Sequence, residues 1–314
     1  MSTDAGTASA IALRNRGAIR AAAGLVLLCA VVSTVSPVFL GLENASNLLS
    51  QLAPLLLVAL GETLVVITAG LDISIGAVIS LTTAIVSLPA LGAAGVPVAL
   101  LVAAAFGLVN GAGVVRLGIH PIVMTLATMT IAHGMALLLR PTPGGDVGPL
   151  LVGLVNGNLV GVPAAAFWIV AGMAIFVYLL RHSRFGLHLY AVGGSFDSAR
   201  LGGVASARVT VTAYVLCSSM AGVAGIYLSG RIASGDPLIG MPYMVDAIIA
   251  MALGGTFLTG GIGSAWGTLA GVAIIGVMAN GMNLANVSPF YQDIVKGVLL
   301  VLAALMYRRR EIGL

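Results

Sequence analysis

The chain has 314 residues, 59% of them hydrophobic and only 8% charged, with a net charge of +4. About a quarter of the residues in soluble domains are charged, so this composition excludes an ordinary soluble domain and predicts a chain whose solvent is the lipid bilayer. The basic residues are scattered between apolar runs, which argues against nucleic acid as a partner. The 42 glycines, close to twice the usual share of about 7%, predict closely packed helices.

Long apolar runs recur along the whole chain. A membrane-spanning helix needs about 20 mainly apolar residues, so these runs predict an all-α, polytopic transmembrane helical bundle of about 10 spans. The runs cover residues 17–36, 48–70, 73–92, 96–115, 120–139, 163–181, 208–230, 243–261, 265–285 and 290–307. We therefore expect a single transmembrane domain over residues 17–307, with tails at residues 1–16 and 308–314.

The distribution of arginines predicts how the bundle is oriented, because loops rich in Lys and Arg stay on the cytoplasmic side. With ten spans and the N-terminus inside, only Arg140 and Arg231 fall on the outer side, and the other arginines fall in the cytoplasm. Both tails are therefore predicted to be cytoplasmic.

A short internal echo links the two halves of the chain. Residues 107–111 (GLVNG) lie late in the fourth run, and residues 276–281 (GVMANG) lie late in the ninth. Five spans separate the copies, and an odd number reverses the direction through the membrane, as in transporters built from inverted repeats. The echo predicts two inverted five-helix halves, with chance similarity as the open alternative.

The longest cytoplasmic connection, residues 182–207, separates these halves. Ser195 is a good helix N-cap, Asp197 favours the helix N-terminus, and Gly202 is a stop signal, so a short helix is predicted over residues 196–201. Isolated helices under roughly 12–15 residues are marginal in water, so we expect this one to be a docking surface. The alternative is a solvated linker whose charges only enforce topology.

Motifs for catalysis and for nucleotide binding are missing from the sequence. A phosphate-binding loop needs a lysine followed by Ser or Thr, whereas Lys296, the single lysine, precedes Gly297. Cys29 and Cys217 lie in apolar runs without metal-like spacing. We therefore expect no catalytic residue, no metal and no cofactor in this chain, and any ATP must be hydrolysed by a partner.

Polar groups inside the apolar runs are the candidates for a solute pathway, because they are costly in a membrane. The tentative pathway residues are Glu62, Asn110, Asn280 and Asn283. Amides suit sugar hydroxyls because they both donate and accept hydrogen bonds. Hydrogen bonding between helices is the equally open alternative for all four.

Three further ionisable residues invite structural interpretations. Asp72 is predicted to cap a helix, and Lys296 is predicted to pair with either Asp246 or Asp293. His133 lies on an apolar helix without an obvious acidic partner, and we expect it to be packed or hydrogen-bonded.

Several stretches in a fixed order carry a family resemblance. They are residues 61–76 (GETLVVITAGLDISIG), 121–130 (PIVMTLATMT), 191–194 (AVGG), 199–203 (ARLGG), 246–250 (DAIIA), 254–256 (GGT), 260–263 (GGIG) and 280–284 (NGMNL). From about residue 45 to 307 the chain resembles the ribose/xylose/arabinose-type permeases of bacterial ATP-binding-cassette sugar importers.

The resemblance implies a multi-pass permease of the bacterial inner membrane that forms the pathway for a monosaccharide, a pentose or a related sugar. It further implies a second permease copy, a cytoplasmic ATPase subunit, and a periplasmic or lipoprotein sugar-binding protein. The residues that it implies for contact with the ATPase are Arg184, Gly186, Gly193, Gly194, Ala199, Arg200 and Gly202.

Two other classes of function compete with the importer. An ion-coupled secondary transporter needs a buried group that loads and releases an ion, and Glu62 is the residue placed for that role. A membrane-embedded enzyme normally gathers His, Asp or Arg at one interface, whereas this chain disperses them.

Overall fold

The computed structural model describes residues 21–159 and 161–306, so the predicted tails lie outside the described residues. The fold is all-helical apart from β1 (Asn158–Leu159) and β2 (Val162–Pro163), which pair antiparallel. The helices are Ala21–Val35, η1 (Pro37–Leu40), α2 (Leu42–Ile67), α3 (Ile75–Val86), η2 (Gly92–Ala94), α4 (Gly95–Arg116), α5 (Pro121–Leu139), α6 (Pro149–Asn156), α7 (Ala164–His182), α8 (Arg184–Gly194), α9 (Phe196–Leu201), α10 (Ser206–Ile232), α11 (Met241–Leu253), α12 (Ala265–Leu284) and α13 (Pro289–Met306).

Six helices in the described part of the chain are long and apolar enough to cross a membrane, namely α2, α4, α5, α7, α10 and α12. The all-α, polytopic fold class is thereby confirmed. The predicted number of about ten spans is not confirmed. The first and last runs hold the shorter helix Ala21–Val35 and α13, which is not among the six. The runs at 73–92 and 243–261 hold only α3, with 12 residues, and α11, with 13. At 1.5 Å per residue, neither helix is long enough to span about 30 Å of hydrocarbon.

Burial explains why the sequence overstated these two elements. Every residue of α3 is buried, and the helix carries apolar residues on all sides, with Ser80, Thr82 and Thr83 as its polar members. A helix that is hydrophobic on all sides belongs either to a protein core or to a membrane span, and composition does not separate the two. The turns that flank α3 and α11 shorten both helices.

The order of helix lengths repeats along the chain. α2, α3, α4 and α5 have 26, 12, 22 and 19 residues, and α10, α11, α12 and α13 have 27, 13, 20 and 18. The turns after α2 and α10 match as well, because residues 69–76 (AGLDISIG) and 233–240 (ASGDPLIG) share Ala, Asp, Ile and Gly at the same spacing. Ala69 and Ala233 both adopt a left-handed backbone conformation, with φ of 62° and 51°.

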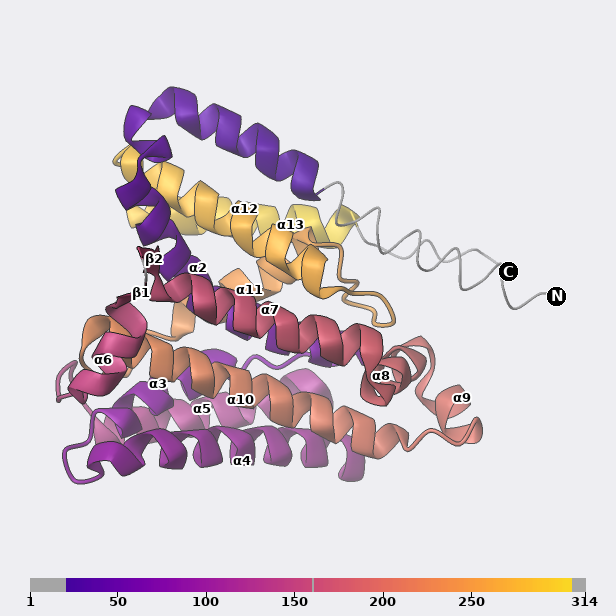
Figure 1. Ribbon diagram of the computed structural model, residues 1–314. Helices are drawn as coiled ribbons and strands as arrows, with labels where there is room; N and C mark the ends of the chain where they lie inside the picture. The colour runs from indigo at the N-terminus through magenta and orange to yellow at the C-terminus, as the bar shows by residue number, and fades with distance from the viewer. Residues whose placement is uncertain (1–20, 160, 307–314) are drawn as a thin grey trace.

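The two longest helices, α2 and α10, pack against each other in opposite directions. Tyr227 donates a hydrogen bond to the Ser50 carbonyl near one end of the pair, Gly61 contacts Cys217 at the middle, and Gly70 contacts Tyr214 at the other end. α10 also packs on α3 and α4, while α2 packs on α11 and α12. Figure 1 shows α8 and α9 at one end of this bundle and α6 with the β pair at the opposite end.

Gly107 tests how closely α4 and α10 must approach. A Cβ at Gly107 would lie 2.6 Å from the Val215 Cα, whereas a Cβ at Gly134 of α5 would meet nothing within 4 Å. We expect Gly107→Ala to destabilise the protein by roughly 1–3 kcal/mol through overpacking, and Gly134→Ala to leave stability unchanged or raise it through helix propensity. Thermal unfolding in detergent measures both, and equal midpoints for the two variants would contradict this packing.

Candidate functional site

The connection between α7 and α10 folds into two capped helices. Ser183 accepts a hydrogen bond from the Gly186 backbone N–H at 3.0 Å and caps α8. Ser195 accepts one from the Ser198 backbone N–H at 3.2 Å and caps α9. α9 occupies residues 196–201, so the predicted short helix and its cap are confirmed, while α8 was not predicted.

The seven residues expected to contact a partner divide into two groups. Arg184, Gly194, Arg200 and Gly202 are exposed, and they share this surface with Phe196 and Leu201, which are 38% and 87% exposed. Gly186 and Ala199 are buried, and Gly193 is half-buried. The first group is available to another protein, and the second holds the two helices against the bundle.

Gly193 of α8 lies where three segments meet. A Cβ at this position would collide with the Ile67 carbonyl, which ends α2, and with the Gly261 backbone in the loop before α12. The Gly261 backbone N–H donates a hydrogen bond to the same Ile67 carbonyl at 2.9 Å. Gly260 packs on Ala69 in the turn after α2. We call these five residues the glycine junction.

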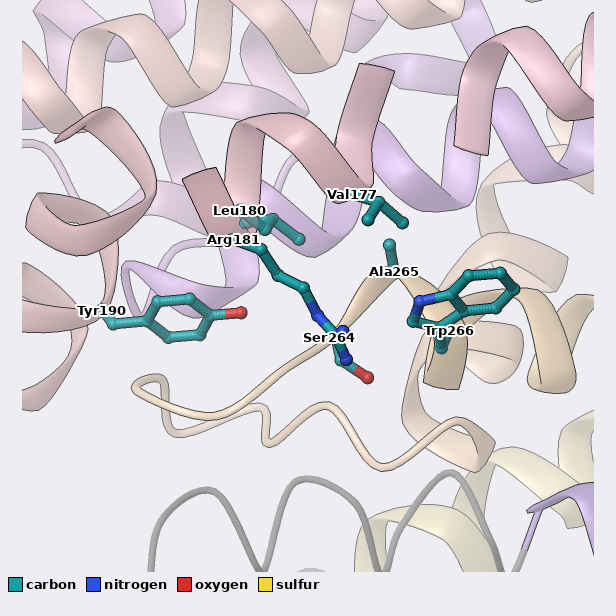
Figure 2. Close-up of a pocket in the computed structure, with 7 residues that line it drawn as sticks. All are labelled: Val177, Leu180, Arg181, Tyr190, Ser264, Ala265 and Trp266. Atoms are coloured by element: carbon teal, nitrogen blue, oxygen red, sulfur yellow. The ribbon is translucent and has the colours of Figure 1, made fainter. Parts of the chain in front are cut away.

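A second contact fastens α8 beside the glycine junction. The Tyr190 hydroxyl donates a hydrogen bond to the Gly263 carbonyl at 2.7 Å. Figure 2 shows Tyr190, Arg181 of α7 and Ser264 facing one another, with Trp266 on the far side. These residues line a cavity of about 10 Å³, close to the size that holds one water molecule. The contact between α8 and the α11–α12 loop is therefore tight.

A buried polar network holds the turn between α2 and α3. Glu62 accepts a hydrogen bond from the Asp72 backbone N–H at 3.0 Å, and the Cys217 thiol donates to the other Glu62 oxygen at 3.3 Å. The Asp72 carboxylate accepts from the Ser74 backbone N–H at 3.0 Å and from the Ser218 hydroxyl at 3.3 Å. Asp72 thus holds the turn before α3, but the predicted capping role is wrong: Ser74 is the N-cap residue of α3, and no side chain accepts a capping hydrogen bond there.

Asn110 joins this network to α5. Its amide nitrogen donates to the Asp72 carboxylate at 3.3 Å, and its carbonyl oxygen accepts from the Thr128 hydroxyl at 2.6 Å. Asn110 and Glu62 are both completely buried. In this conformation the polar atoms of Asn110 and Glu62 form hydrogen bonds within the protein. The sequence left such bonding open as the alternative to a role in the solute pathway.

The other two candidate pathway residues lie in the second half of the chain. Asn280 of α12 and Asn44 of α2 form a reciprocal amide pair, with hydrogen bonds of 2.8 and 3.0 Å. Asn283 is exposed and accepts a hydrogen bond from Gln292 at 2.8 Å. The structure therefore does not gather the four candidates into one site.

Lys296 and Asp246 form the ion pair that the sequence proposed as one of two options. The Lys296 Nζ lies 2.9 Å from the Asp246 Oδ2, and this is the single ion pair among the described residues. Among those residues, no group of His, Cys, Asp and Glu is arranged to hold a metal ion.

Sequence reasoning missed the glycine junction, although the glycine pairs at 193–194 and 260–261 signal a close backbone approach.

Short helices broken near the centre of an apolar bundle are typical of membrane transporters, and comparison with known proteins identifies the kind. Residues 44–304 match the family described as the branched-chain amino acid transport system permease component. The chain belongs to this family of transport permeases. Together with the curated sugar permeases described next, this match confirms the family assignment made from the motifs.

Several curated relatives match over nearly the whole chain. The ribose import permease protein RbsC of Bacillus subtilis is 37% identical and covers 92% of both chains. The protein of the same name from Escherichia coli is 36% identical over 91% of this chain and 92% of its own. The L-arabinose ABC transporter permease protein AraH of Azospirillum brasilense is 32% identical over 91% and 86%. No solved structure matches the chain.

Asn110 and Asn283 make a matched test of the buried network. Asn110→Ala removes a donor to Asp72 and an acceptor for Thr128, and unpaired buried polar groups cost about 1–3 kcal/mol each. Asn283→Ala removes a single hydrogen bond at an exposed position. We expect a clear fall in the thermal unfolding midpoint for Asn110→Ala and little change for Asn283→Ala. A similar midpoint for both variants would show that the network does not stabilise the fold.

Proposed function

We propose that this protein is the membrane-spanning permease subunit of an ATP-driven importer. It forms the translocation pathway for a monosaccharide, a pentose or a related sugar, delivered by a binding protein. The observation that carries the proposal is the 37% identity to a ribose import permease over 92% of the chain. Permease subunits of this kind are not themselves catalytic, and ATP is hydrolysed by a separate cytoplasmic subunit.

The arrangement of the subunit follows from this function. It is a multi-pass protein of the bacterial inner membrane with cytoplasmic termini, and it pairs with a second copy of itself. The repeated helix lengths and the antiparallel packing of α2 on α10 support two inverted halves, each led by one long helix. The short helices α3 and α11 then enter the membrane from opposite sides.

The α8–α9 segment is the docking site for the ATPase subunit. Support comes from its exposed basic residues Arg184 and Arg200, from the exposed apolar residues Phe196 and Leu201, and from the caps that hold the helices in shape. Through the glycine junction, a movement of α8 reaches both the end of α2 and the loop before α12. A rigid-body shift of α8 thus changes the packing of both halves.

An ion-coupled secondary transporter fits the structure less well. Such a protein needs a carboxylate that meets water in order to load its ion. Glu62 and Asp72 are completely buried and their oxygens accept hydrogen bonds from protein groups. Asp246 is partly exposed, but its charge is already balanced by Lys296. Uptake of labelled monosaccharides into vesicles tests both functions. Import that requires ATP, the ATPase and the binding protein supports the importer, and uptake by this chain alone under an ion gradient would overturn it.

Charge reversal tests the docking surface. Arg200 is exposed on α9, and Arg116 is exposed at the end of α4, at the same end of the bundle. We expect Arg200→Glu to reduce co-purification of the ATPase subunit because it places a repulsive charge in the interface. Arg116→Glu, which makes the same change beside the interface, leaves co-purification intact. Full ATPase association and uptake with Arg200→Glu would remove α9 from the interface.

The two adjacent glycines of α8 test the transmission of movement. Gly193→Ala forces a methyl group into the glycine junction, while a Cβ at Gly194 would meet nothing within 4 Å. Overpacking here costs roughly 1–3 kcal/mol and displaces α8 from the end of α2. We expect Gly193→Ala to bind the ATPase but to show clearly reduced ATP-driven uptake, with Gly194→Ala near the original rate. Equal uptake by the two variants would rule out transmission through the glycine junction.

A further inference from the structure

The helix pair α11–α13 departs from its counterpart in the first half of the chain. α3 and α5 contain no Asp, Glu, Lys or Arg, whereas α11 and α13 carry Asp246, Asp293 and Lys296. α3 and α11 follow matching turns after matching long helices, so the shared scaffold forms in one half without charge. The charged groups of the second half are therefore not required by the scaffold itself.

The α11 helix is also less covered than α3. All 12 residues of α3 are buried, while the buried residues of α11 are Ala247, Ile249, Ala250, Met251 and Ala252 out of 13. Tyr243, Met244 and Asp246 are half-buried. Tyr243 and Asp246 lie three positions apart and share one side of the helix. This side of α11, together with Lys296, reaches the surface of the protein.

The ion pair is an expensive way to join two helices. Charged side chains inside a membrane cost about 2.5–3.5 kcal/mol each on insertion scales, and replacing a buried ion pair by apolar residues is often neutral or stabilising. The side chains of Lys296 and Asp246 are 14% and 16% exposed. The Asp246 Oδ1 is buried and has no hydrogen-bond partner among the described residues. Oδ1 therefore lies below the surface, while the Lys296 ammonium group, which has three N–H donors, donates one hydrogen bond among the described residues, to Oδ2. The partly exposed pair thus keeps hydrogen-bonding capacity, as free donors, at the edge of the bundle.

This capacity suits a neutral solute rich in hydroxyl groups. A carboxylate only accepts hydrogen bonds, an ammonium group only donates them, and a hydroxyl does both. Because the two charges cancel, a neutral solute replaces water on the pair without any need for a compensating ion. Glu62, Asn110 and Asn280 do not offer such a surface, since their polar groups are engaged inside the protein.

We infer that Asp246 and Lys296 form a hydroxyl-binding station on the solute pathway, with Tyr243 beside them on α11. The inference rests on the proposed import function and adds the residues that meet the solute. It places the pathway along α11 and α13. Glu62 and Asn110 instead stabilise the turn between α2 and α3.

Water access to α11 is the first test. Tyr243→Cys is treated with a membrane-impermeant methanethiosulfonate reagent in vesicles of both orientations that carry the complete complex. Leu101→Cys, on the 72% exposed and apolar outer face of α4, is the control for a lipid-facing position. Thiols react as thiolates, so we expect labelling of Tyr243→Cys, above that of the unsubstituted chain with Cys29 and Cys217, and none of Leu101→Cys. Labelling of Tyr243→Cys no greater than that of Leu101→Cys overturns the inference.

A double apolar variant is the second test. Asp246→Leu with Lys296→Met keeps the helices together without charges, so we expect normal membrane insertion and ATPase association but at least about tenfold less sugar uptake at low concentration. Uptake equal to that of the unsubstituted protein would show that the pair only joins α11 to α13, and would overturn the inference. If the double variant fails to insert, the cysteine labelling decides. Failure of the unsubstituted complex to import any sugar with ATP would instead contradict the proposed function.

Discussion

The close antiparallel packing of α2 on α10 is the contact on which the rest of the structure depends. These two helices form the centre of the bundle, and each supports the short and long helices of the opposite half: α10 packs on α3 and α4, and α2 packs on α11 and α12. Such packing requires small residues, because helices in a membrane gain nothing from apolar contact alone. A Cβ at Gly61 would lie only 3.1 Å from the Cys217 Cα of α10, and a Cβ at Gly225 of α10 would lie 2.7 Å from the Thr82 Cβ of α3.

A second constraint is that backbone groups outside helices must find partners inside the protein when lipid surrounds it. The two matching turns share one solution, because the carboxylates of Asp72 and Asp236 each accept the backbone N–H two residues further on, at 3.0 and 2.8 Å. The turn after α2 adds the carboxylate of Glu62. The turn after α10 adds hydroxyl groups of α3, since the Asp236 backbone N–H donates to Thr83 at 3.1 Å and that of Gly240 donates to Ser80 at 3.0 Å. The second turn is therefore bonded to α3, and the start of α3 is bonded to the carboxylates of the first turn.

The sequence predicts the local features well and the central ones poorly. Long apolar runs, the cap at Ser195 and the short helix after it depend on neighbours in the chain, and all were predictable. The lengths of α3 and α11 depend on their tertiary surroundings, because a buried helix and a lipid-facing helix have the same composition. The sequence leaves the role of Glu62 open for a related reason, because a carboxylate in an apolar run signals either function or bonding within the protein. Its bond to the Asp72 backbone is a tertiary contact that no local pattern predicts.

The glycine junction connects these constraints to movement. The Ile67 carbonyl, at the last residue of α2, accepts the Gly261 N–H and lies against Gly193, so the end of the central helix, the α11–α12 loop and α8 share one contact. Asp72, five residues after Ile67, forms hydrogen bonds at the start of α3. The Ser80 and Thr83 hydroxyls of α3 in turn accept hydrogen bonds from the turn before α11. In the proposed importer, a displacement of α8 is passed to both short helices through these consecutive backbone contacts and hydrogen bonds. Packed interfaces of this kind switch between discrete arrangements, which is the behaviour that a gate on a solute pathway requires.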